Sequence, residues 1–443
     1  MIPNTNAYWL ANAHVPVPLL VGYPCAIAAD LALVHLEIRD GVIAQILPGD
    51  QPPPSSAPIV DLNRGQVWCC FIDLHTHLDK GHIWERSPNP TGTFEDALRI
   101  VASDSHAHWR SEDVYRRMEF GLKCSYAHGT SAIRTHIDSS GEQARISLDV
   151  FKTLKAQWAD RLTLQAVSLV PLDYFMTPAG EQLADQMAAV GGVLGGLPMM
   201  GEELDAQLDR VFTLATERHL DLDLHTDESD DPNAVTLRHV AMAVLRHGFT
   251  GQVVCGHCCS LAVQSPEESL KTIQAVKQAR IGIVSLPLCN LYLQGRNPID
   301  GQRLVESIAP RQTPRWRGVT LLHELKHYGV AVAIASDNCR DPFHAYGDHD
   351  GLEVYSQSVR IAQLDAPHGD WCRAITTTPA DLMRLPTLGR IGVGLPADLI
   401  VFKARYFSEL LSRPQSDRIV LRQGKAIDTT LPDYTELDDL ITR

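Results

Sequence analysis

Eight apolar segments recur along the middle of the chain, and helix-like segments separate most of them. Their length suits strands, and their unbroken apolar character indicates strands buried on both faces. They fall at residues 67–74, 130–137, 162–171, 190–199, 221–225, 251–257, 281–288 and 329–336. The clearest helix-like segments lie at 111–128, 201–219, 232–247 and 265–280. This alternation is typical of a parallel (β/α)8 barrel of the TIM type, so the predicted fold class is α/β.

The two ends of the chain have a different pattern, made of short strand-like segments and turns. Asp40-Gly41 is a strong hairpin signal between two such segments near the N-terminus. Similar short segments return near the C-terminus. We therefore predict a smaller β-sandwich domain built from both termini, with residues 1–66 and 386–443 on either side of a barrel at 67–385.

Composition restricts the compartment and the class of partner. The formal net charge of the 443-residue chain is −14, which argues against nucleic acid or an anionic membrane surface as partner. No apolar run approaches the roughly 20 residues that span a bilayer, and we expect no signal peptide. The ten cysteines are scattered and form no disulfide framework. Cys255 and Cys258 have C-x-x-C spacing without a second pair, which disfavours a structural zinc or redox site there. We expect a cytoplasmic protein.

Polar residues close five of the predicted strands. In a barrel of this kind, function gathers at the carboxyl ends of the strands. For any one histidine, a hydrogen-bonded core residue is the simpler interpretation, but five strand ends together favour a metal site. The residues are His75 and His77 after the first strand, His136 after the second, His225 and then Glu228 after the fifth, His257 after the sixth, and Asp337 after the eighth.

Three imidazoles and one carboxylate form a ligand set for one divalent ion. We predict that Zn²⁺ or Fe²⁺ is held by His75, His77, His225 and Asp337, with one position open for water. Such a metal lowers the pKa of bound water from about 15.7 towards about 7. Glu228 beside it suits a proton shuttle to a leaving nitrogen. The alternative is that Glu228 belongs to a solvated acidic loop.

These strand ends, taken together, resemble the amidohydrolase superfamily and, more narrowly, its cytosine deaminase group. Further matching stretches lie at residues 133–138, 225–228, 290–296, 337–343 and 394–399, so the resemblance covers nearly the whole chain. It implies a mononuclear, metal-dependent hydrolytic deaminase of an amino-substituted N-heterocycle, which releases ammonia after attack of metal-bound hydroxide.

The resemblance also implies roles for individual residues. Asp337 would act as a base towards the metal-bound water, Glu228 would shuttle protons, and His257 would polarise or orient the water. Phe343 corresponds to an aromatic residue that packs on the substrate ring, and His136 and Asn338 would be substrate-binding residues.

Two departures from the cytosine deaminase pattern concern specificity. That group has a glutamine after its third strand that binds the pyrimidine amide edge; here Leu172 and Asp173 occupy the best-aligned positions, and Asn338 replaces a second aspartate. Losing the glutamine disfavours cytosine and favours a larger ring, such as a pterin or guanine-like purine, or a triazine. If Asp173 faces the barrel mouth, it accepts from a ring with N–H donors, such as a 2-amino-4-oxo edge. The alternative is that it faces solvent.

Two other classes of protein compete with a deaminase. A cyclic-amide hydrolase on the same barrel usually binds two metals through a carboxylated lysine at the fourth strand, and residues 191–200 contain no lysine. A non-catalytic barrel would be expected to lose the ligands or the shuttle residue. We therefore expect an enzyme with one divalent metal ion per chain, a small N-heterocycle as substrate, and a homo-oligomeric assembly.

Overall fold

The centre of the molecule is a closed ring of eight parallel strands. The computed structural model describes residues 2–23, 30–54, 57–296 and 313–441. Hydrogen-bonded ladders join three strands in the order β6-β7-β8 and five in the order β13-β12-β11-β10-β9. Parallel bridges Val167–Val193 and Thr76–Asp337 join these two sheets at both edges. The strands are β6 Phe71–Thr76, β7 Thr130–Asp138, β8 Thr163–Leu169, β9 Leu194–Gly196, β10 Leu222–Thr226, β11 Val253–His257, β12 Gly282–Ser285 and β13 Val332–Ile334.

Helices surround this ring, and the predicted barrel is confirmed. The four helices expected from the sequence are α2 Ser111–Ala127, α5 Leu204–Glu217, α6 Thr236–His247 and α7 Pro266–Ala279. The other barrel helices are α1 Phe94–His108, α3 Gly141–Gln157, α4 Pro178–Ala189, α8 Pro287–Leu293, α9 Leu322–His327, α10 Gly351–Ala362 and α11 Thr377–Leu382. Short 3₁₀ turns are η2 Leu172–Met176, η3 Cys259–Ala262 and η4 Trp371–Ile375. Among the described residues, no helix has the length and apolar character needed to cross a membrane.

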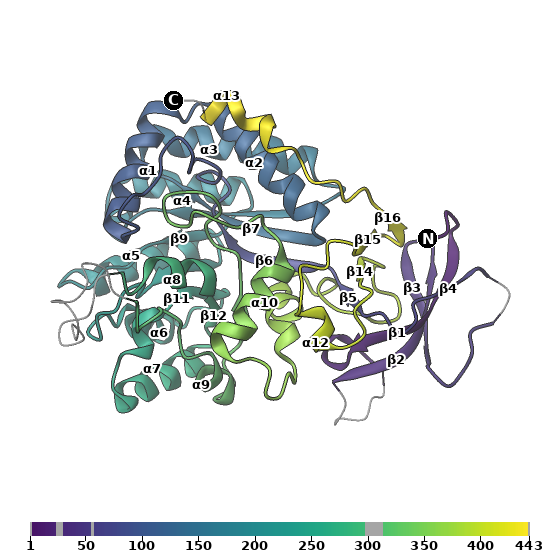
Figure 1. Cartoon of the computed structure of the whole chain (residues 1–443). Helices are drawn as coiled ribbons and strands as arrows, with labels where there is room; N and C mark the ends of the chain where they lie inside the picture. The colour runs from purple at the N-terminus through teal and green to yellow at the C-terminus, as the bar shows by residue number, and fades with distance from the viewer. Residues whose placement is uncertain (1, 24–29, 55–56, 297–312, 442–443) are drawn as a thin grey trace.

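Two four-stranded sheets lie beside the barrel and contain strands from both ends of the chain (Figure 1). One has the order β3-β2-β1-β4 and the other β16-β15-β14-β5. The hairpin predicted at Asp40-Gly41 joins β2 to β3, whose Arg39 and Val42 are paired. The strands are β1 Ala7–Pro16, β2 Leu31–Arg39, β3 Val42–Pro48, β4 Ile59–Asp61, β5 Val67–Cys69, β14 Leu399–Val401, β15 Ile419–Arg422 and β16 Lys425–Ala426, with η1 Val17–Leu19 and α12 Phe407–Leu410 between them.

The predicted strand at 67–74 is in fact two strands that belong to different sheets. Val67, Trp68 and Cys69 pair with β14 in the terminal sheet, whereas Phe71 begins the ladder with β7. The change of sheet occurs at Cys70, so we propose that the barrel begins at Phe71 rather than at residue 67. The outer limits of the proposed domains, residues 1 and 443, lie outside the described ranges.

The last described residues return to the barrel instead of staying with the terminal sheets (Figure 1). They form η5 Tyr434–Leu437 and α13 Asp438–Ile441. Leu437 packs with Phe120 and Cys124 of α2, and Arg116 of α2 forms an ion pair with Asp439 at 2.6 Å. The predicted β segment at 386–443 therefore includes a tail that covers α2.

Candidate active site

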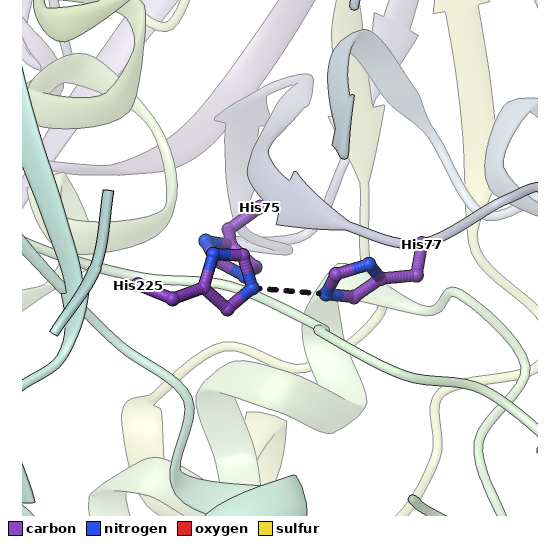
Figure 2. Close-up of side chains that lie close together, drawn as sticks. All are labelled: His75, His77 and His225. Carbon is purple, nitrogen blue, oxygen red and sulfur yellow. Dashed lines mark hydrogen bonds between the residues drawn. The ribbon is translucent and has the colours of Figure 1, made fainter. Parts of the chain in front are cut away.

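The predicted metal ligands converge at the carboxyl end of the barrel. His75 lies in β6, His77 follows it, His225 lies in β10 and Asp337 follows β13. The Nε2 atoms of His77 and His225 are 3.3 Å apart, and a dashed line joins the two rings in Figure 2. Oδ1 of Asp337 is 3.3 Å from Nε2 of His77 and 3.7 Å from Nε2 of His75. Donors that surround a tetrahedral zinc at about 2.0–2.2 Å lie about 3.3–3.6 Å apart, so these spacings fit one ion.

The same four side chains carry buried polar atoms that lack a hydrogen-bond partner. Both ring nitrogens of His75 and both carboxylate oxygens of Asp337 are in this state, as is Nδ1 of His77 and of His225. Such atoms are costly to bury. Burial, with neighbouring imidazoles and cations, holds the pKa of each histidine well below its usual range, so the rings are neutral, as metal ligands must be. These residues fit a divalent ion.

Backbone contacts between the first and last strands hold Asp337 against the histidines. Asp337 donates its backbone N–H to the carbonyl of His75 at 2.8 Å, and Thr76 donates its hydroxyl to the carbonyl of Asp337 at 2.8 Å. The φ of Asp337 is 62° and that of His257 is 67°, both in the left-handed region that non-glycine residues avoid. A Cβ at Gly256 would lie 2.9 Å from the ring of His75, which explains glycine there. Strained backbone of this kind clusters at functional sites.

Glu228 and His257 form a hydrogen-bonded group beside the ligands. Oε1 of Glu228 is 3.3 Å from Nδ1 of His257 and accepts from the amide of Asn290 at 3.0 Å. The side chain of Glu228 is only 8% exposed, which does not fit a solvated loop. Burial lowers the pKa of His257, but the carboxylates of Glu228 and Asp337 outweigh it and raise the pKa above its usual value. Burial also raises the pKa of Asp337.

His136 lies beneath the ligands rather than in the cavity above them. Its ring centroid is 4.0 Å from that of His75, and its Nε2 is 3.7 Å from Oδ1 of Asp223. It is fully buried and does not line the cavity. This position does not fit the direct substrate contact that was predicted for His136. It fits a residue that packs against the ring of His75.

A cavity of about 820 Å³ opens above the ligands. Its walls include the predicted residues Glu228, His257, Asn338 and Phe343. Phe343 offers its ring at the wall, with Phe94 of α1 edge-on at 5.6 Å between centroids. The amide of Asn338 donates to Asp341 at 2.6 Å, so its orientation is fixed by a buried carboxylate.

Leu172 and Asp173 do not line this cavity, contrary to the prediction that they bind the substrate. Leu172 is buried in the hydrophobic core and packs at Gly196, whereas Asp173 is exposed. The turn η2 begins at Leu172, and neither side chain is among the residues that line the cavity. Pro171, just before it, lines the cavity instead. Asp173 therefore does not contact a substrate in this cavity.

Lys80 is a cavity residue that the sequence reasoning did not identify. Its ammonium forms an ion pair with Asp138 at 2.7 Å and lies 5.3 Å from the centroid of Phe343. Burial lowers the pKa of Lys80, but Asp138 and Asp79 outweigh this and raise it, so the side chain is charged. The sequence does contain a signal for Lys80: Asp79 and Lys80 come shortly after the two histidines, and Asp138 directly follows the second predicted strand. Lys80 offers a substrate a buried cationic donor.

The fourth barrel strand offers no bridging ligand. β9 consists of Leu194, Gly195 and Gly196, so it supplies no lysine for the carbamate bridge of a binuclear site.

Comparisons with known proteins agree with this geometry. Residues 89–427 match the amidohydrolase family. The chain is 50% identical over 440 residues to a pterin deaminase of Rhizobium rhizogenes (strain K84), covering 99% of this chain and 98% of that protein. It is 24% identical to an N-isopropylammelide isopropyl amidohydrolase of Pseudomonas sp. (strain ADP), covering 78% of this chain and 81% of that protein.

Among solved structures, the 5-methylcytosine deaminase from Klebsiella pneumoniae has a similar fold. The two structures superpose with a TM-score of 0.79 and 23% sequence identity, over 96% of this chain and 98% of that chain. At this identity the likeness concerns the fold.

Proposed function

Since this chain belongs to the amidohydrolase family, we propose that it is a metal-dependent hydrolytic deaminase of a pterin ring. The observation that carries the proposal is the 50% identity to a pterin deaminase over 99% of the chain. The net reaction replaces an exocyclic amino group by a carbonyl oxygen: water adds to the ring carbon, and ammonia leaves.

The cavity suits a fused bicyclic ring. Its volume of about 820 Å³ lies in the upper part of the range, about 300–1,000 Å³, that holds small organic ligands. We propose that Phe343 packs against the ring and that Lys80 donates to the 4-oxo oxygen, because an ammonium group can only donate. This assigns recognition of the 2-amino-4-oxo edge to Lys80 in place of Asp173.

We propose that His75, His77, His225 and Asp337 hold one Zn²⁺ or Fe²⁺ ion. The converging Nε2 atoms and the unpartnered carboxylate support this ligand set. When bound, such an ion polarises water and makes it nucleophilic near neutral pH.

The proton transfers fall to residues of the chain. In our proposal, Asp337 accepts a proton from the attacking water, and Glu228 carries a proton to the ring nitrogen and then to the leaving amine. His257, held by Glu228 at 3.3 Å, orients the water. Asn290 donates to the same oxygen of Glu228, Oε1. In our proposal, the other carboxylate oxygen transfers the proton to the substrate.

We also propose that the enzyme works in the cytosol as a homo-oligomer with small-molecule substrates and without nucleic acid. The nine cysteines among the described residues are all free and buried, as expected where thiols stay reduced. The net charge of −14 supports the absence of nucleic acid among its partners.

Ammonia release from pterin, guanine and cytosine tests the substrate assignment. We expect kcat/KM for pterin to exceed that for cytosine by about 10²-fold or more, because a site that pairs with one ring edge rejects rings that lack it. The Glu228→Gln variant, prepared in parallel, controls for contaminating deaminases. A higher kcat/KM for cytosine than for pterin would contradict the assignment.

A further inference from the structure

A second group of metal-ligating side chains lies outside the catalytic centre. His82, Cys339 and His349 each offer one ligand atom, and these atoms lie within 4.8 Å of one another. His82 belongs to the loop after β6, Cys339 to the loop after β13, and His349 precedes α10. None of the three lines the catalytic cavity.

The two imidazoles of this group have no hydrogen-bond partner at any ring nitrogen. Both nitrogens of His82 and both of His349 are buried and unpartnered, and the two residues are only 3% and 4% exposed. Each ring could donate one hydrogen bond and accept another. An ordinary core histidine satisfies at least one of these, so two neighbouring rings with none leave four ring nitrogens free for a ligand.

The backbone holds both histidines in an unfavourable conformation. The φ of His82 is 62° and that of His349 is 53°, in the left-handed region where a Cβ is crowded. The backbone N–H of His82 donates to the carbonyl of Cys339 at 3.1 Å, which ties the two loops together. The ring of His349 lies against α2, where a Cβ at Gly121 would come within 3.0 Å of its Nε2.

Charges of both signs surround the group: Arg117 and Arg340 act on His82, and Asp348 acts on His349. Desolvation and the neighbouring His349 hold the pKa of His82 well below its usual range, and burial lowers that of His349 to about 4. Both rings are therefore neutral and available as ligands. Asp348 lies near both Cys339 and His349; its Oδ2 is 3.0 Å from Nε2 of His128, and its Oδ1 is buried without a hydrogen-bond partner.

We propose that His82, Cys339 and His349 bind a second Zn²⁺ ion, separate from the catalytic metal. Two imidazoles and a thiolate are a ligand set that zinc favours. In tetrahedral sites such atoms lie about 3.4–3.6 Å apart, so only small side-chain movements are needed from the present spacing. The ion would join the loops after β6 and β13, which carry the catalytic ligands.

Cobalt titration of the metal-free full-length protein tests this proposal, because only a thiolate ligand gives a sulfur-to-cobalt charge-transfer band in the near ultraviolet. The catalytic ligand set has no sulfur. We expect two equivalents of Co²⁺ per chain and a charge-transfer band that grows with one of them. A folded protein that binds one equivalent and shows no such band would overturn the proposal, whatever happens to the variants.

Three variants locate the second ion. Cys339→Ser should lose the band and one equivalent of Co²⁺, whereas His225→Ala should lose one equivalent and keep the band. Cys289→Ser is the matched control, because Cys289 is a buried thiol near Asp337, and it should keep the band. Loss of the band in Cys289→Ser but not in Cys339→Ser would contradict the assignment. Far-ultraviolet circular dichroism checks that each variant is folded.

Discussion

Replacing Glu228 with glutamine separates proton transfer from metal binding. Glutamine has nearly the same size as glutamate, and its amide oxygen can still accept from Asn290 at the 3.0 Å position that Glu228 occupies now. It cannot take up and release a proton. Glu228 is not among the four predicted ligands, so the catalytic metal should remain at full occupancy in the variant.

Glu228→Gln should lower the rate of turnover through two separate effects. Loss of a positioned general acid–base typically costs about 10²–10⁴-fold. In the unmodified protein, the carboxylate of Glu228 lies 3.3 Å from His257 and raises the pKa of its imidazole. The variant removes this carboxylate, so the imidazole should lose its proton at a lower pH. We expect kcat to fall by at least about 10²-fold, which is about 2.7 kcal/mol in the activation free energy.

Steady-state ammonia release and metal analysis on the same preparations measure this prediction. The control is Asp230→Asn, which removes a carboxylate from the same acidic loop but from a residue that does not line the cavity. We expect near-normal turnover in the control. Turnover in Glu228→Gln within a few-fold of the unmodified enzyme, with full metal content, would refute the proposed shuttle.

Three other perturbations have defined outcomes. His225→Ala should lose the catalytic metal and activity together. Metal analysis and an ammonia assay on the same preparation measure this, and a variant that keeps both the metal and the activity would contradict the prediction. Lys80→Met should lower kcat/KM for pterin by about 10-fold or more without changing metal content, as lost charged hydrogen bonds do. Asp104→Asn should lower the free energy of unfolding by about 3 kcal/mol, because it leaves the buried guanidinium of Arg86 with one fewer partner; urea unfolding measures this.

The contribution of Asp104 to the free energy of unfolding should depend on pH. Burial raises the pKa of Asp104, but its bonds to Arg86, Ser87 and Trp109 outweigh burial and lower the pKa below the ordinary 3.8. The folded state therefore favours the ionised form, so this stabilisation is complete above the unfolded pKa and is lost as the pH falls below about 3.8 through the folded value. Asp104→Asn should flatten the unfolding free energy in this range; an unchanged acid limb would contradict the assignment.

The barrel and the convergence of its strand-end residues could be predicted because the sequence repeats one local pattern. His75, His225 and His257 each close or directly follow a buried run, where a polar side chain is costly unless it has a function. The barrel geometry then brings strand ends together whatever their separation along the chain. The local apolar pattern and the barrel topology therefore suffice to predict this arrangement, and a single sequence shows both.

The substrate-facing residues could not be predicted in the same way, because they depend on turns. Leu172 and Asp173 follow the third barrel strand at the expected distance, but a 3₁₀ turn begins at Leu172 and directs them elsewhere. Lys80 is informative only once Asp138, from a different strand, is known to lie 2.7 Å from it. Neither the turn nor the contact leaves a periodic signal.

The loop after β13 connects these observations. Asp337, Asn338 and Cys339 are consecutive, yet the first two face the catalytic cavity and the third lies with His82 and His349. Because Asp337 has a left-handed backbone, the loop needs contacts on both sides to hold it. Hydrogen bonds with β6 supply one side, and the bond from the backbone N–H of His82 to the carbonyl of Cys339 holds the loop two residues further on. A perturbation at Cys339 should therefore reach Asp337, two residues earlier in the same loop, even though Cys339 does not line the cavity.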